Sequence, residues 1–168
     1  MFGPDRQFLE VVDYQSKRNT ARAGGDGAVK HSGDMLRSVL CEGTHTISVD
    51  LDRLDPGVVE LFISLSAWAG ARLGEIRAPS VSLTDPGSGA PLCEYRLEGV
   101  SRASLDTYSS VVMCRVFRGG APGAPAGGGW QVEALGQLGH GHADNYEPLL
   151  HCIRHEIGLA DSLAGWKV

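Results

Sequence analysis

Short apolar segments separated by turn residues are the feature of this chain that most limits its fold. The segment 46–51 (TISVDL) alternates apolar and polar residues, and 58–68 (VVELFISLSAW) is a longer run rich in β-forming side chains. Between them, Asp55, Pro56 and Gly57 provide turn chemistry, because proline presets φ and glycine accepts unusual dihedrals. The pattern predicts two core strands with a hairpin-like connection.

The same pattern recurs along the rest of the chain. Segments 79–83 and 92–97 are joined by a turn at 85–89, and a further strand pair is expected at 108–117 and 130–135. Near the start, 8–14 (FLEVVDY) also resembles a strand. Short strands at even spacing with turn signals are typical of a β-sandwich.

Two segments depart from the strand pattern. The insert 119–129 (GGAPGAPAGGG) has almost no side chain that could pack, and a mobile loop is expected there. After it, Asn145 can cap a helix and Pro148 suits a first turn. The apolar residues that recur on one face of this helix are Leu149, Leu150, Ile153 and Ile157. The expected fold is mostly β, with one C-terminal α-helix.

Composition restricts the organisation and the class of protein. With 168 residues and 42% hydrophobic residues, the chain 1–168 is expected to be a single domain with its own core. A net charge of -5 without a basic stripe argues against nucleic acid as a partner. No stretch approaches the roughly 20 apolar residues of a membrane span, and the start lacks a signal-peptide pattern. Four cysteines without a CxxC pair predict reduced thiols and a cytoplasmic location.

The segment with the most specific pattern is 26–34 (DGAVKHSGD), which is followed by ISVDL at 47–51. Here the chain resembles the TerD family, whose domains carry a DG turn, a strand, an H-[ST]-G-D-N signature and a VDL strand. The resemblance continues in register from about residue 11 to about residue 157. Its later parts are LFISLSAW at 61–68, LGEIRAPSVSLTDPGSGAPLCEYRL at 73–97, SSVVMCRVFR at 109–118 and WQVEALGQLGHG at 130–141.

The resemblance implies a β-sandwich that binds calcium with acidic loops and takes part in stress responses, including tellurite resistance. It implies no catalytic residue. The positions that would belong to a cation site are Asp34, Gly33, Glu42 and Asp26. Calcium needs about six to eight oxygen ligands, so several acidic loop residues would have to converge.

Three departures from the family pattern weaken that site and the sandwich. Met35 stands where the signature has asparagine, so a thioether that a hard cation ignores replaces an amide oxygen. The stretch 41–46 holds one carboxylate where the family has an acidic loop. The earlier half of the family domain, with its D-[LV]-D-A-S motif, has no match here. We therefore expect a degenerate site in which calcium binding is weak or lost, and an incomplete sandwich.

Histidines suggest a second kind of metal site. His151 and His155 are four residues apart on the predicted helix, with Cys152 adjacent and His140 and His142 just upstream. Such spacing places two imidazoles on one face, as in many zinc sites, but structural zinc takes four ligands and Cys152 points about 100° away. A polar helix face is the alternative, and the order of residues is not the HExxH of a metalloprotease.

Two functions follow as hypotheses. In the first, the chain is a non-catalytic binding or structural module of a larger assembly, cytoskeletal or other. Another protein chain, or a second copy, would then supply the missing strands. In the second, it is a working calcium-binding stress-response protein of the tellurite-resistance type. An enzyme is not expected, since neither a G-x-S-x-G elbow nor a phosphate-binding lysine motif occurs.

Overall fold

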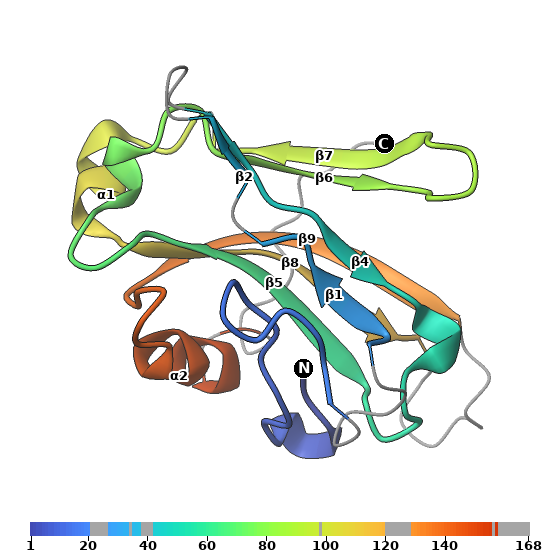
Figure 1. Cartoon of the computed structure of the whole chain (residues 1–168). Coiled ribbons are helices and arrows are strands. Elements are labelled where there is room, and N and C mark those ends of the chain that lie inside the picture. Colours follow the sequence, from blue (N-terminus) through green and yellow to red (C-terminus); the bar gives the residue numbers. More distant parts are fainter. Residues whose placement is uncertain are drawn as a thin grey trace. The chain divides into compact units, whose positions relative to one another are not determined.

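A computed structural model describes residues 1–20, 27–33, 35–37, 42–97, 99–119, 129–155 and 157 of the chain. The chain is mostly β and sandwich-like with a C-terminal helix, as predicted (Figure 1). The strands are β1 (Val29–His31), β2 (Met35–Arg37), β3 (Glu42–Thr44), β4 (Ile47–Val49), β5 (Glu60–Ser66), β6 (Ser80–Thr84), β7 (Pro91–Arg96), β8 (Ser110–Arg118) and β9 (Trp130–Gly139). The helices are α1 (Arg102–Thr107) and α2 (Glu147–His155), and short 3₁₀ turns lie at Pro4–Arg6, Leu51–Arg53 and Leu73–Glu75.

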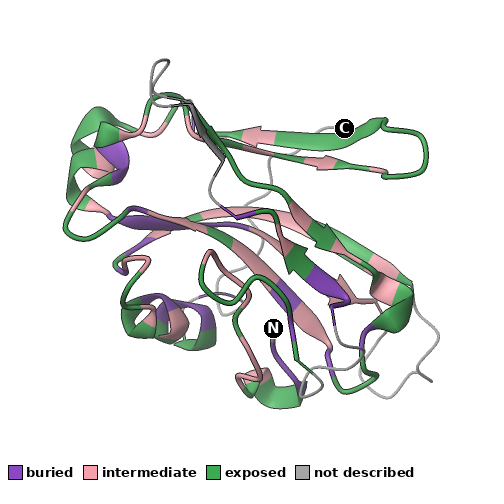
Figure 2. Cartoon of the chain, in the orientation of Figure 1, coloured by how far each residue is buried: buried purple, intermediate pink, exposed green. Residues whose placement is uncertain are grey.

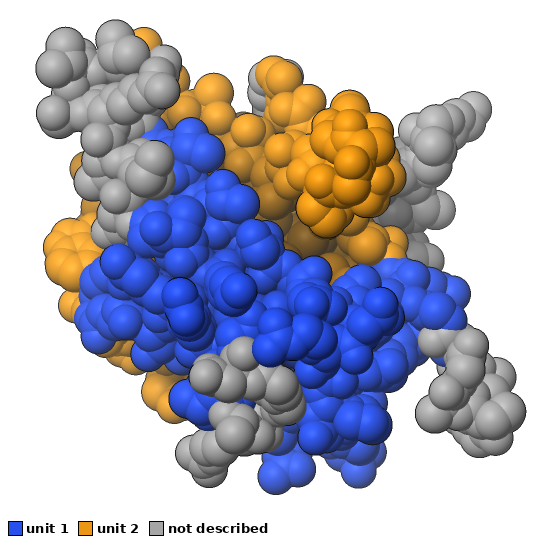
Figure 3. All heavy atoms as spheres, turned by 45° about the vertical axis from the view of Figure 1, so that its right-hand side comes forward, with its two compact units in different colours: residues 1–61, 117–131 blue, residues 62–116, 132–168 orange. Residues whose placement is uncertain are grey.

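The strands form small sheets, and the chain divides into two compact units. The order β5-β8-β9 makes a three-stranded sheet, whereas β1 pairs with β4, β2 with β3 and β6 with β7. Unit 1 comprises Met1–Leu61 and Phe117–Gln131, and unit 2 comprises Phe62–Val116 and Val132–Val168 (Figure 3). Each unit has its own buried residues.

In unit 1, the first residues of the chain bond to the start of β5. The amide of Phe2 donates to the carbonyl of Glu60 at 2.8 Å, and the amide of Val59 donates to the carbonyl of Phe2 at 3.0 Å. The Phe2 ring is buried and meets Phe8 edge to face, with 5.7 Å between ring centroids. This segment therefore covers part of the β5 edge, where unpaired main-chain groups would otherwise be exposed.

The strand expected at 8–14 does not form. Phe8 makes a single bridge to Phe2, and the chain then bends. The carboxylate of Asp13 accepts hydrogen bonds from the amides of Gln15 and Ser16, at 2.9 and 2.6 Å. A short acidic side chain that bonds the main chain two and three residues ahead favours a turn over a ladder.

Unit 2 has its core around a cluster of fully or nearly fully buried side chains. The cluster is formed by Leu73, Leu97, Val111 and Met113, and the partly buried side chains against it include Val81, Tyr95 and Leu138. Residues of β8 and β9 therefore pack against the hairpin β6-β7, which supplies Val81 and Tyr95. This is the sandwich-like part of the fold.

The hairpin β6-β7 and the pair β8-β9 confirm the expected strand pairs. β6 and β7 are antiparallel, with Ser80 opposite Arg96, and β9 continues to Gly139, four residues beyond the predicted end. The hairpin-like connection expected at 55–57 is wrong, because the strands before and after it do not pair with each other. Asp55 does close a turn with the amide of Gly57 at 2.7 Å, but β4 and β5 belong to different sheets.

Helix α2 begins where the sequence predicted a cap, because the side chain of Asn145 accepts from the amide of Glu147 at 3.2 Å. Leu149, Cys152 and Ile153 are its buried residues. Helix α1 was not predicted. It has six residues, too few for a periodic pattern, and is capped by Ser101, whose hydroxyl accepts from the amide of Ser104 at 3.1 Å.

Most of the expected loop at 119–129 lies outside the described residues. Its two ends are joined, since the amide of Gly119 donates to the carbonyl of Gly129 at 2.8 Å. The β8-β9 ladder is thus closed immediately before the insert.

Substitution of Gly136 in β9, which has a positive φ of 63°, tests how the hairpin β6-β7 packs on β9. A Cβ on Gly136 would overlap the hydroxyl of Tyr95, whereas a Cβ on Gly89, with φ 70°, would meet nothing. Gly89→Ala should cost about 1–2 kcal/mol of unfolding free energy from backbone strain alone, and Gly136→Ala about 1–3 kcal/mol more from overpacking. Urea unfolding measures both. Equal losses, or no recovery when Tyr95→Phe is added to Gly136→Ala, would contradict this packing.

Candidate functional site

The signature segment lies on β1 and the turn that follows it, in unit 1. β1 pairs antiparallel with β4, with Val29 opposite Val49 and His31 opposite Ile47. At the end of this ladder, the amide of Thr46 donates to the hydroxyl of Ser32 at 2.9 Å, and that hydroxyl donates to the carbonyl of Gly33 at 3.0 Å. The serine of the signature therefore fixes the turn that leaves β1.

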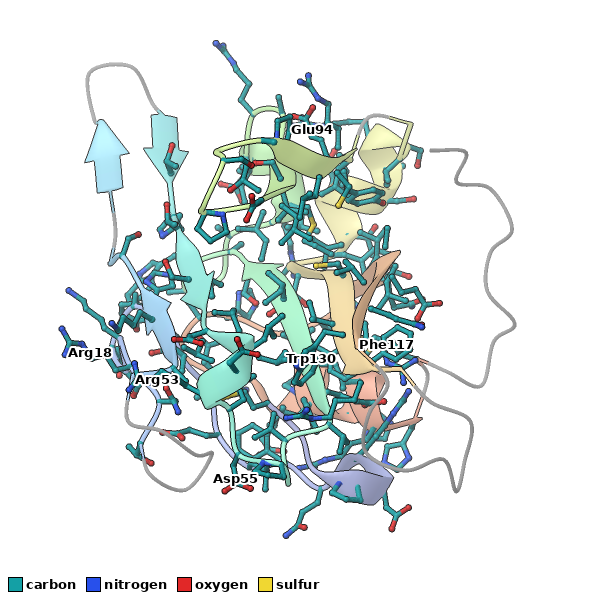
Figure 4. All side chains as sticks on the ribbon, turned by 90° about the vertical axis from the view of Figure 1, so that its right-hand side faces the viewer. Arg18, Arg53, Asp55, Glu94, Phe117 and Trp130 are labelled. Carbon is teal, nitrogen blue, oxygen red and sulfur yellow. The ribbon has the colours of Figure 1, made fainter. Side chains whose placement is uncertain are left out.

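The other edge of β1 is held by residues 17–19. The amide of Asn19 donates to the carbonyl of Val29 at 3.1 Å, and the side-chain oxygen of Asn19 accepts from the amide of Val29 at 2.8 Å. Two residues further along β1 (Figure 4), the amide of His31 donates to the carbonyl of Lys17 at 2.9 Å. Asn19 is completely buried, so water cannot reach its side-chain oxygen. The hydrogen bond from the amide of Val29 satisfies that oxygen instead.

Gly33 adopts a left-handed conformation with φ 84°, which glycine reaches without steric cost. Its amide donates to Nδ1 of His31 at 2.9 Å. A Cβ at this position would lie 2.9 Å from the ammonium nitrogen of Lys17. The histidine and glycine of the signature thus form a turn that a lysine side chain crosses closely.

The candidate cation ligands are only partly described. Asp26 and Asp34 lie outside the described residues, and the side chain of Glu42 does too, although its main chain lies in β3 rather than in a loop. Gly33 alone is fully described, and its carbonyl oxygen accepts from Ser32. Within the described residues, no group of three acidic, histidine or cysteine side chains is placed to hold a metal ion.

Carboxylates in other turns bind the main chain. Asp85 accepts from the amides of Gly87 and Ser88, at 3.2 and 3.0 Å, and from the hydroxyl of Ser88 at 2.6 Å. The Ser88 hydroxyl, followed by these two amides, lowers the pKa of Asp85. Because its oxygens are used in stabilising the hairpin turn, this carboxylate acts structurally.

The histidines of α2 lie as the sequence predicted. His151 and His155 share one face, with 4.6 Å between ring centroids, and both are exposed. Cys152 is buried on the other side of the helix. Upstream, His140 stacks on Tyr108 at 4.9 Å. Cys152 therefore does not join the imidazole pair.

A cleft of about 410 Å³ in unit 2 was not predicted. Its walls come from the 3₁₀ turn Leu73–Glu75, the residues that follow it, and α1. Ala78, in this wall, has a positive φ of 47° immediately before Pro79. Nothing in the residue pattern indicates the cleft, because α1 and the strained alanine leave no periodic signal.

The chain is mostly β and sandwich-like, and it carries a histidine-serine-glycine turn at the end of the short strand β1. The family model described as TerD domain matches residues 12–149 of the chain. The chain belongs to the TerD domain family, the family of tellurium-resistance-type stress-response proteins. A comparison with curated proteins found no match. None of the described helices is both long and apolar enough to cross a membrane.

The thiols differ in environment. Cys93 is exposed, Cys114 is half-buried and Cys152 is buried, and none of these three is in a disulfide. Burial, and secondarily the nearby Cys93 thiol, raise the pKa of Cys114 to about 11. Cys41 lies outside the described residues.

Thiol labelling with a chromogenic disulfide at pH 8 should reflect this difference. In a Cys41→Ser background, we expect one fast-reacting thiol, and Cys93→Ser should remove it. At that pH only about one Cys114 in a thousand would be a thiolate, so its reaction should be slow and should accelerate as the pH rises toward 11. Two fast thiols at pH 8 would contradict the burial of Cys114.

Proposed function

We propose that this chain is a non-catalytic TerD domain that acts by binding other protein chains, and that its calcium site is degenerate. The observation that carries the proposal is the Lys17 ammonium group beside Gly33 of the signature. A cation already occupies the space next to the turn from which calcium ligands would have to come. Its charge opposes a second cation there, because like charges at short range repel.

The ligand chemistry of the signature supports the same conclusion. Met35 follows Asp34 where the family signature has asparagine, so the signature carries a thioether in place of an amide oxygen. The hydroxyl of Ser32 and the carbonyl of Gly33, which could be oxygen ligands, bond each other at 3.0 Å. A hard cation would have to displace both the lysine and this hydrogen bond.

The hairpin β6-β7 supports the binding of a partner chain. Among the described residues it is a two-stranded sheet, with no further strand on either edge. Figure 2 shows it exposed along most of its length, and Leu92 on β7 is 61% exposed. Available edges with an exposed apolar side chain favour strand addition by another chain, including a second copy.

Calorimetry with calcium tests the state of the cation site. We expect no saturable heat when calcium chloride is titrated into the purified chain, and no difference in Asp34→Ala. A saturable heat that Asp34→Ala abolishes would instead establish a working calcium site, as in the alternative function. Lys17→Ala is the matched variant, because removal of the ammonium group should restore some affinity if it is the main obstacle.

Sedimentation velocity at increasing protein concentration tests the binding of chains. We expect the isolated chain to self-associate, and Leu92→Lys on the hairpin to weaken that association without loss of fold, because the side chain is exposed. Val11→Lys, at an exposed apolar residue of unit 1, is the control and should have no effect. A well-folded monomer at all concentrations would contradict strand addition by a second copy.

A further inference from the structure

Helix α2 has one side fixed by packing and one side left to solvent. Leu149, Cys152 and Ile153 are each about 3% exposed. Gly139 and Gly141 make room for them: a Cβ on Gly139 would lie 3.9 Å from both Cys152 and Leu149, and one on Gly141 would lie 3.1 Å from Leu149. The rotation of the helix about its own axis is therefore set by the residues it buries.

This rotation leaves His151 and His155 together on the exposed side. They are one helical turn apart, their ring centroids are 4.6 Å apart, and the rings are tilted by 44°. Glu147, one turn before His151, is also exposed, as is Arg154 next to the pair. The carboxylate favours a bound cation and the guanidinium group opposes it, so the imidazoles have to provide the affinity.

Two imidazoles at this spacing have the geometry of a chelate. Metal to nitrogen distances of about 2.0–2.1 Å place two nitrogens bound to one ion roughly 3 Å apart. Rings with centroids 4.6 Å apart reach that separation by small rotations of exposed side chains. Two nitrogen ligands leave the remaining coordination positions to water, which suits an open site rather than a structural zinc centre.

We propose that His151 and His155 form a two-histidine site for a divalent transition-metal ion on the exposed face of α2. Imidazole nitrogen prefers copper(II), nickel(II) and zinc, and along this series copper(II) binds most tightly. Calcium, which takes oxygen ligands, is excluded by the same chemistry. The site is independent of the signature turn and of the proposed function.

The test uses the full chain and copper(II) chloride alone, in a buffer that does not coordinate metals. We expect one saturable site by calorimetry. His151→Ala and His155→Ala should each lower the affinity about a hundredfold, because the second imidazole binds an ion already held nearby. His140→Ala is the control, since it removes an imidazole that stacks on Tyr108 outside the pair. Circular dichroism should show unchanged folding in all three variants.

Two further measurements identify the ligands. Copper(II) should broaden the ring-proton signals of these two imidazoles in NMR spectra before those of the other histidines. Binding should be weaker at pH 5 than at pH 7.5, because protons compete for the ligand nitrogens. The proposal would be overturned by the lack of a saturable site, by equal loss of affinity in His140→Ala, or by binding that neither α2 substitution changes.

Discussion

Hydrogen bonding of short strands on both edges is the constraint on which the signature turn depends. β1 has only three residues, too few to be stable alone, and it is held by β4 on one side and by residues 17–19 on the other. Residues 17–19 do not form a regular ladder with β1, and the buried side-chain amide of Asn19 supplies a hydrogen bond in its place. Loss of such a buried partner would leave the Val29 amide unsatisfied, at a cost of about 1–3 kcal/mol. The positions of Ser32 and Gly33 follow from this arrangement.

Much of the β architecture could be predicted because its signals are local. The hairpin β6-β7 carries its own turn chemistry at Asp85, and β8 reads as a long apolar run. Where the prediction failed, non-local bonds decided the structure. The apolar segment 8–14 gave way to the Asp13 turn, and β5 took β8 as its partner instead of the preceding strand. A residue pattern shows which segments can be strands, but not which edges meet.

The candidate site shows the same limit. The sequence pointed to the turn around Gly33, which lies within the residues 12–149 that match the family model. It did not point to Lys17, which is sixteen residues away in the chain and reaches the turn only because residues 17–19 align with β1. The α2 histidines were predictable by contrast, since helical spacing fixes which side chains become neighbours. Sites within one element can be read from spacing, whereas sites between elements need the fold.

The hydrogen bond between Gly119 and Gly129 has a practical consequence. Because the ladder closes at this bond, the length of the insert is separated from the register of β8 and β9. The entropy of closing a loop grows only with the logarithm of its length, by about 0.6 kcal/mol for each doubling. This position can therefore accept a peptide tag or a small fluorescent reporter, which gives a way to follow the protein in cells without a fusion to either end of the chain.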